Sequence, residues 1–115
     1  MYLPKVIKFN AKEPEAAKRY AEIARFIDLK GSTDEELVDA LIAELRGMNE
    51  KLNIPTCIKE YEGGIIDETE FNEKLPSVAE LAVGDACTGS NPRPITPAEM
   101  EKLLTCCYYD KEVDF

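Results

Sequence analysis

The sequence of 115 residues contains no histidine. Without histidine, proton transfer near neutral pH would depend on paired carboxylates, a thiol or a perturbed lysine. The four cysteines (Cys57, Cys87, Cys106 and Cys107) include no CxxC pair, and adjacent residues on a helix point about 100° apart. We therefore expect no zinc or other metal site and predict reduced thiols. One of Cys106 and Cys107 should face the core, and the other should face a neighbouring element or solvent.

The sequence also lacks tryptophan, a long apolar run and an excess of basic residues. No segment approaches the roughly 18 apolar residues that a membrane span requires. The first five residues, Met1 to Lys5, lack the features of a signal peptide, so we predict a cytoplasmic protein. Acidic residues outnumber basic ones by 23 to 14, giving a net charge of −9, which repels a phosphate backbone. We therefore expect neither a nucleic acid nor a membrane as a partner.

Apolar residues recur at three- and four-residue spacing along most of the chain, and no segment alternates as a strand does. This pattern predicts an all-α fold, a compact multi-helix bundle forming one domain over residues 1–115. Pro76 marks either a break or a new first turn within its helix. Helices are expected over Met1 to Asn10, from Pro14 to about Lys30, from Asp34 to Leu52, around Cys57 to Glu60, from Asp67 to Ala82 and from Thr96 to Cys107, followed by an acidic tail, Asp110 to Phe115.

Three of these helices begin with residues that cap helix N-termini. A cap side chain accepts a hydrogen bond from a backbone N–H in the first turn, and a Glu three residues on can return one. Proline at the first helical position strengthens the prediction because its missing N–H costs nothing there. The predicted caps are Ser32-Thr33-Asp34-Glu35 with Glu35 reaching back, Asp67 with Glu70, and Thr96-Pro97-Ala98-Glu99.

The segment Gly84 to Arg93 combines turn formers with a thiol, an acid and an arginine between two helices. Loops held by rigid elements are frequent positions of binding residues. Judged by residue types alone, a loop that locks two helices together is favoured over a ligand site. Cys87 has no histidine to activate it, so a small buried filler is favoured over a nucleophile. The residues that we assign to loop structure are Asp85, Asn91, Pro92 and Arg93.

The stretch Asp85-Ala86-Cys87-Thr88-Gly89-Ser90-Asn91-Pro92-Arg93 closely resembles the C-terminal loop of iron-containing (group III) alcohol dehydrogenases. Tyr2 to Asn10 is similar to the family's Leu-Leu-Pro-x-Val-x-x-(Phe/Tyr)-Asn stretch. Tyr20 to Ala24 resembles the next helix, and Leu52-Asn53-Ile54-Pro55 resembles the Leu-x-Ile-Pro linker. These landmarks follow the family's order and spacing, so the resemblance covers essentially the whole chain.

The resemblance implies a parent enzyme with two domains. An N-terminal α/β domain binds NAD(P), and an all-α C-terminal domain supplies most ligands of an iron ion that is held by one Asp and three His. The last of these ligands precedes the Leu-Leu-Pro stretch, with which this sequence begins. We therefore expect residues 1–115 to be a partial C-terminal domain that binds neither iron nor NAD(P) and is inactive alone. By the same resemblance, Cys87 forms a wall of the substrate pocket.

Two interpretations of the isolated chain differ in the partner that they predict. In the first, the chain packs against the nucleotide-binding domain of the parent enzyme, or self-associates through the surface that this domain would cover. In the second, it is a free-standing helical module with an interaction or regulatory role. An autonomous thiol or metal protein is disfavoured by the cysteine spacing.

Overall fold

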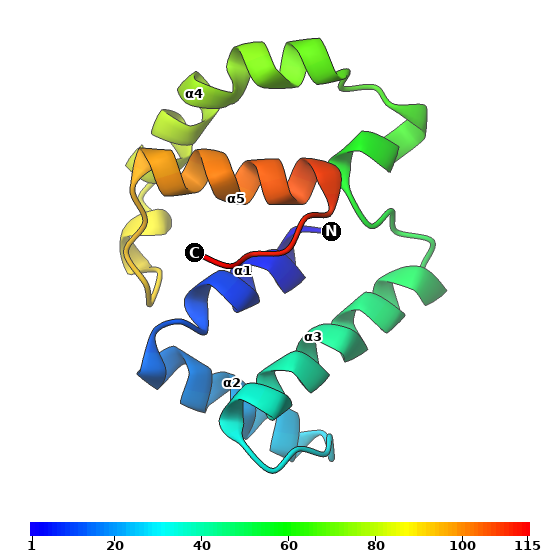
Figure 1. Cartoon of the computed structure of the whole chain (residues 1–115), viewed down its shortest axis with the longest axis vertical. Helices are drawn as coiled ribbons and strands as arrows, with labels where there is room; N and C mark the ends of the chain where they lie inside the picture. The colour runs from blue at the N-terminus through cyan, green and yellow to red at the C-terminus, as the bar shows by residue number, and fades with distance from the viewer.

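The computed structural model describes all 115 residues and contains helices and no strands (Figure 1), which confirms the all-α prediction. None of the helices combines the length and the hydropathy that a membrane span requires. The elements in chain order are α1 (Tyr2–Asn10), α2 (Pro14–Phe26), α3 (Asp34–Lys51), the 3-10 helix η1 (Ile58–Gly63), α4 (Glu68–Gly84), the 3-10 helix η2 (Thr88–Ser90) and α5 (Pro97–Tyr109).

The helices form two pairs with α1 between them. At one end of the molecule α2 packs against α3, and at the other end α4 packs against α5. Helix α1 contacts α3 on one side and α5 on the other, and the C-terminal segment runs beside it (Figure 1). The first helix therefore holds the two pairs together.

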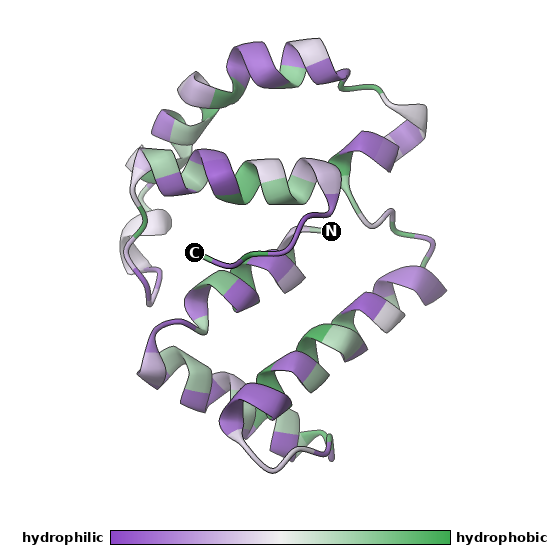
Figure 2. Ribbon diagram, in the orientation of Figure 1, coloured by the Kyte–Doolittle hydropathy of each residue, from purple (hydrophilic) through white to green (hydrophobic).

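Only 19 of the 115 residues are buried, and thirteen of them form three separate clusters. Helix α1 contributes Ile7 to the first cluster and Phe9 to the second. Along α3 and α5 hydrophobic and hydrophilic residues are interleaved (Figure 2), as expected for helices with one covered face. We call these the α1–α3 cluster (Ile7, Ala21, Ala24, Leu37, Val38, Leu41), the α1–α5 cluster (Phe9, Leu103, Cys106, Val113) and the η1–α5 cluster (Ile58, Cys107, Tyr108).

Two of the predicted caps are confirmed. The Asp67 side chain accepts a hydrogen bond from the Glu70 N–H at 2.8 Å. At α5 the capping box is complete, since Thr96 accepts from the Glu99 N–H and the Glu99 carboxylate accepts from the Thr96 N–H. Each cap satisfies backbone donors that have no partner within the helix.

The cap of α3 lies one residue later than predicted. Thr33, not Ser32, accepts from the first turn, through the Glu36 N–H at 3.1 Å. The Glu36 carboxylate accepts from the Ser32 N–H at 2.6 Å, so Glu36 replaces Glu35 as the residue that reaches back. Both hydroxyls are suitable caps, and the sequence pattern alone does not distinguish them.

The region around α4 differs from the predicted stripe. The helix continues through Pro76 to Gly84 without a break, and Ala79 is its only buried residue. Val78 and Leu81, which continue the apolar period, are 45% and 75% exposed. The short helix predicted from Cys57 is the 3-10 helix η1, beginning at Ile58.

The C-terminal segment is packed rather than free. Val113 is 2% exposed, and the Phe115 ring lies 6.0 Å from the Phe9 ring, centroid to centroid. Lys5 of α1 donates to the Lys111 carbonyl. The two apolar residues of this acidic segment hold it against α1, and the acidic composition gave no indication of that contact.

Candidate functional site

The loop between α4 and α5 is fixed by its own side chains. The Asp85 carboxylate accepts from the Cys87 N–H at 2.8 Å, and the Ser90 hydroxyl donates to the Cys87 carbonyl at 2.8 Å. The Thr88 hydroxyl donates to the Ala82 carbonyl at 2.7 Å, which ties the loop to the last turn of α4. Cys87 is therefore held on both sides in a defined position.

A second set of contacts ties the loop to α1. Asn91 and Asn10 exchange two amide hydrogen bonds, of 2.9 and 2.7 Å. Arg93 donates to the carbonyls of Phe9 and Phe115, each at 2.9 Å, and its guanidinium lies 3.8 Å from the centre of the Phe9 ring. Through these bonds Asn91 and Arg93 connect the loop to α1. Pro92 is exposed.

An apolar cavity of about 260 Å³ lies where the loop, α1 and α5 meet. Tyr2, Val6 and Phe9 line it from one side of α1, where their spacing places them on successive turns. Cys87 lines it from the loop, and Leu103 is among the residues that line it from α5. A cavity of this size and lining suits a small apolar group better than a charged one.

Cys87 is exposed, so the prediction that it is a buried filler is wrong. The Asp85 and Ser90 hydrogen bonds hold its backbone at the rim of the apolar cavity rather than within the helix packing. Residue type alone favours burial for a free cysteine. Cys87 is exposed because the hydrogen bonds of the tight loop fix its position.

Cys106 and Cys107 are both buried, so the second of them faces a neighbouring element and not solvent. Cys106 belongs to the α1–α5 cluster and Cys107 to the η1–α5 cluster. Helix α5 is covered on two sides, and neighbouring residues point in sufficiently different directions to reach both. Burial raises the pKa of Cys106, and burial followed by the neighbouring Cys106 raises the pKa of Cys107 to about 11.

The exposure pattern predicts a single reactive thiol in the native chain. Cys57, Cys106 and Cys107 are buried, and only the thiolate form of a cysteine reacts readily. Ellman's reagent at pH 8 should therefore titrate about one thiol rapidly and the other three only on unfolding. Cys87→Ser should abolish the rapid phase, whereas Cys57→Ser should leave it intact. Two or more rapid thiols in the native wild type would contradict the burial of the other three.

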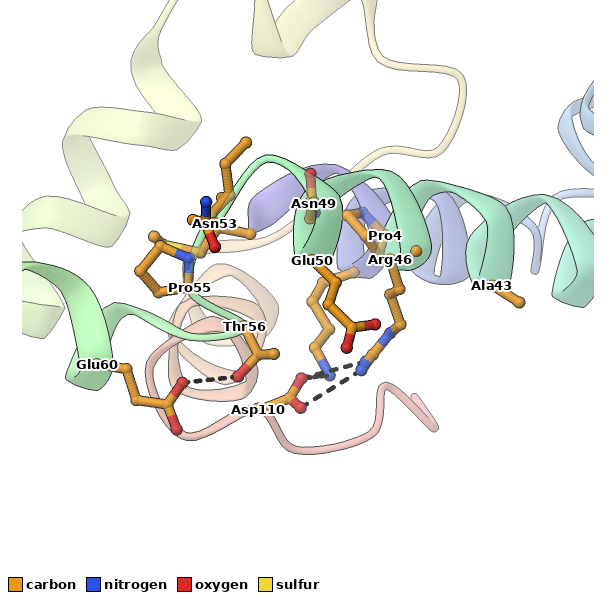
Figure 3. A pocket seen from close by; sticks show the side chains of 14 residues that line it. Pro4, Ala43, Arg46, Asn49, Glu50, Asn53, Pro55, Thr56, Glu60 and Asp110 are labelled. Atoms are coloured by element: carbon orange, nitrogen blue, oxygen red, sulfur yellow. Dashed lines mark hydrogen bonds and ion pairs between the residues drawn. The ribbon is translucent and has the colours of Figure 1, made fainter.

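A larger and more polar hollow, of about 890 Å³, lies between α1, the C-terminal half of α3 and the segment leading into η1 (Figure 3). At its edge Lys5 and Arg46 converge on Asp110. Lys5 Nζ lies 2.9 Å from Asp110 Oδ1, and Arg46 Nη2 lies 3.1 Å from the same atom. Lys5 is 3% exposed. Since these charges are paired with one another, the cluster joins the C-terminal segment to α1 and α3 and does not form a free anion site.

The Asp110 cluster predicts a loss of stability in acid. Burial by itself raises the pKa of Asp110, but hydrogen bonds from Lys5 and Arg46 outweigh it and lower the pKa below the ordinary value. Because the pKa of Asp110 is lower in the folded chain than in the unfolded chain, where it is about 3.9, the ionised carboxylate stabilises the fold above that pH. This stabilisation is lost as the pH falls through the pKa of Asp110 in the folded chain. Asp110→Asn should therefore lower the urea midpoint at pH 6, with a difference from wild type that shrinks below about pH 4. A difference that stays constant from pH 6 to pH 3 would contradict the assignment.

The comparisons with known proteins agree with this architecture. Residues 1–108 match the model of the Fe-containing alcohol dehydrogenase family, C-terminal. The chain therefore belongs to the iron-containing alcohol dehydrogenase family, and the resemblance of its loop and helices to that family is confirmed.

Among its relatives the chain is similar to the NADPH-dependent butanol dehydrogenase of Clostridium saccharobutylicum. The two are 52% identical over 115 residues, which is 100% of this chain and 28% of that enzyme. The chain is 41% identical over 120 residues to the aldehyde-alcohol dehydrogenase of Clostridium acetobutylicum, covering 92% of this chain and 14% of that protein. An alcohol dehydrogenase of Thermococcus barophilus is 34% identical over 110 residues, covering 96% of this chain and 26% of the relative. The chain thus spans between about a seventh and about a quarter of the length of these relatives.

The residues present do not fit the iron that the family name implies. The sequence has no histidine, and no three Cys, Asp or Glu side chains converge closely enough to hold a metal ion. Asp110 at the edge of the polar hollow is no exception, because it is paired with Lys5 and Arg46. No step of a reaction can therefore be assigned to a metal held by these 115 residues.

Sequence reasoning missed three residues that the structure places beside the loop or within the ion cluster: Phe9, Asn10 and Lys5. Phe9 and Asn10 lie in the stretch Tyr2 to Asn10, whose resemblance to the family is the one sequence feature that could have identified them. No sequence feature indicates the burial of Lys5, because a lysine in a helix is ordinarily exposed. Only the fold shows that its face of α1 is covered.

Proposed function

We propose that this chain forms the distal helical wall of the substrate pocket in an iron-dependent, NAD(P)-linked alcohol dehydrogenase, which interconverts an alcohol and an aldehyde in the cytoplasm. The observation that carries the proposal is the similarity over the whole chain to a butanol dehydrogenase, at 52% identity. From that relative we further propose NADPH as the preferred cofactor and a short-chain primary alcohol as the substrate.

In this proposal the residues of the chain bind and orient the substrate and do not carry out the hydride transfer. The apolar cavity beside Cys87 receives the carbon chain, which Val6 and Phe9 cover on the α1 side. Excluding water from that chain favours binding by about 0.8 kcal/mol for each buried CH₂ group. The iron ligands and the nucleotide-binding groups are contributed by parts of the enzyme that correspond to none of these residues.

We propose that the nucleotide-binding domain of the same enzyme covers the surface around Tyr2 and Leu3, beside the apolar cavity. Tyr2 and Leu3 are 51% and 55% exposed, and Tyr2 lines the apolar cavity together with Cys87. Exposed apolar side chains beside a binding cavity are typical of a surface that another domain covers. No observation favours the alternative of a free-standing helical module.

A chimera tests the proposal. The matching 115 residues of the Clostridium saccharobutylicum enzyme are replaced by this chain, and NADPH-dependent reduction of butanal is measured. We expect kcat/KM within about tenfold of the parent, because the residues assigned here position the substrate and leave the chemistry to the rest of the enzyme. The parent enzyme truncated before the matching segment is the control and should be inactive. A folded, soluble chimera without activity would overturn the proposed function.

Within the same chimera, Cys87→Phe should narrow the mouth of the cavity. We expect KM for butanal to rise about tenfold while KM for NADPH changes little, since a bulkier side chain costs about 1–3 kcal/mol in a filled site. Cys57→Ser, at a buried position outside the cavity, is the matched control. An equal rise in both KM values would place Cys87 away from the substrate.

A further inference from the structure

Asn10 is one of only two buried polar or charged side chains in the molecule, with 2% of its surface exposed. Its Nδ2 group donates to Asn91 Oδ1 at 2.9 Å and to the Tyr20 hydroxyl at 3.2 Å. Its Oδ1 atom accepts from Asn91 Nδ2 at 2.7 Å. A buried amide that uses both its donors and its acceptor in this way is costly to disturb, because each lost partner leaves a desolvated polar group.

The amide pair continues into the Cys87 loop. The second N–H of the Asn91 amide donates to the Arg93 carbonyl at 2.6 Å. The Asn91 backbone N–H donates to the Thr88 carbonyl at 3.1 Å, and the Ser90 N–H donates to the Cys87 carbonyl at 3.2 Å. The backbone that follows Cys87 is therefore connected to Asn10 through Asn91.

The other end of the connection is the opposite wall of the cavity. Phe9 directly precedes Asn10, and Tyr2, Val6 and Phe9 line the apolar cavity from α1. Cys87, Thr88 and Asn91 line it from the loop. The Asn10–Asn91 pair thus spans the edge at which the two walls meet.

We propose that Asn10 is a positioning residue that fixes the Cys87 loop against α1 and so sets the width of the apolar cavity. The part of this proposal that concerns substrates rests on the proposed function of the chain. Asn10 acts through Asn91 and does not itself line the cavity. The size of the apolar group that the cavity accepts then depends on an amide pair at the edge of the cavity.

Hydrogen exchange in residues 1–115 tests the positioning role without any activity. In Asn10→Ala the backbone amides of Thr88, Ser90 and Asn91 should exchange about tenfold faster, as the loss of a buried hydrogen-bonded pair implies. Asn91→Ala, which removes the partner from the loop side, should have the same effect if Asn10→Ala fails to fold. The double variant should exchange no faster than either single one, since both remove one interaction.

Tyr20→Phe is the matched control, because it removes the second partner of Asn10 and leaves the amide pair in place. Its loop amides should exchange at the wild-type rate. Unchanged loop exchange in both alanine variants would overturn the proposal. Equal acceleration in Tyr20→Phe would also overturn it, since Asn10 would then act only by joining α1 to α2.

The chimera with the Clostridium saccharobutylicum enzyme tests whether Asn10 affects substrate preference. Across straight-chain aldehydes of increasing length, Asn10→Ala should raise KM for butanal about tenfold, flatten the preference for chain length and leave KM for NADPH unchanged. A uniform fall in kcat with the preference intact would contradict control of the cavity width. A wild-type chimera without activity overturns the proposed function instead, and hydrogen exchange then decides the role of Asn10.

Discussion

Replacing Phe9 by alanine is expected to lower the free energy of unfolding by about 3–5 kcal/mol, the usual cost of truncating a buried aromatic ring. Phe9 is 1% exposed, packs in the α1–α5 cluster and lies under the Arg93 guanidinium. Its loss would open a cavity at the place where α1 meets α5. Urea unfolding followed by circular dichroism measures the change.

The matched control for this variant is Phe26→Ala. Phe26 is 89% exposed at the end of α2, so the same substitution should change the free energy of unfolding by less than about 0.5 kcal/mol. A comparable loss in both variants would mean that Phe9 is not the central packing residue that its burial implies.

Arg93→Ala is expected to lower the free energy of unfolding by about 2–4 kcal/mol. A hydrogen bond from a charged donor contributes about 1.5–3 kcal/mol and a cation–π contact about 0.5–1 kcal/mol, and the contributions of one side chain do not add in full. The Arg93 guanidinium donates to the carbonyls of Phe9 and Phe115 and lies 3.5 Å from the Glu99 carboxylate. Arg93→Lys should recover less than half of the loss, since a single ammonium cannot reproduce the planar fork and the stacking. Urea midpoints of the two variants and the wild type give the comparison.

Arg19→Ala is the control for the charge alone. Arg19 pairs with Glu22 on an exposed face of α2, where its side chain is 77% exposed. Surface pairs of this kind contribute about 0–1 kcal/mol.

Because Arg93 and Phe9 touch, the effects of Arg93→Ala and Phe9→Ala should not add in the double variant. Additive effects would indicate that the stacking seen between them contributes nothing.

Most of the helices could be predicted from the sequence because local rules determine them. The caps at Asp67 and Thr96 act within one turn, and the spacing of apolar residues reflects the helix period itself. The exposure of Cys87 could not be predicted, because it depends on hydrogen bonds within a tight loop. The burial of Lys5 and Asn10 depends on the return of residues 110–115 and on a loop some 80 positions away, and no local pattern carries that information.

The apolar stripe of α4 shows what a local pattern cannot predict. The period of Val78 and Leu81 predicts a covered face of the helix, but both residues are exposed and Ala79 is buried, because periodicity cannot show which face another element covers. For the candidate site, the resemblance of residues 85–93 to a known family identified the loop. Its reciprocal pairing with Asn10 became visible only in the fold.

The division of the core into three clusters has a consequence for how the molecule melts. With α1 supplying Ile7 to one cluster and Phe9 to another, the cooperativity of unfolding depends on a helix of nine residues. If that helix detaches, the α2–α3 pair and the α4–α5 pair become independent unfolding units, each with its own melting temperature. In calorimetry the chain would then show a van't Hoff enthalpy smaller than the calorimetric one, and the gap should widen in variants that weaken either contact of α1.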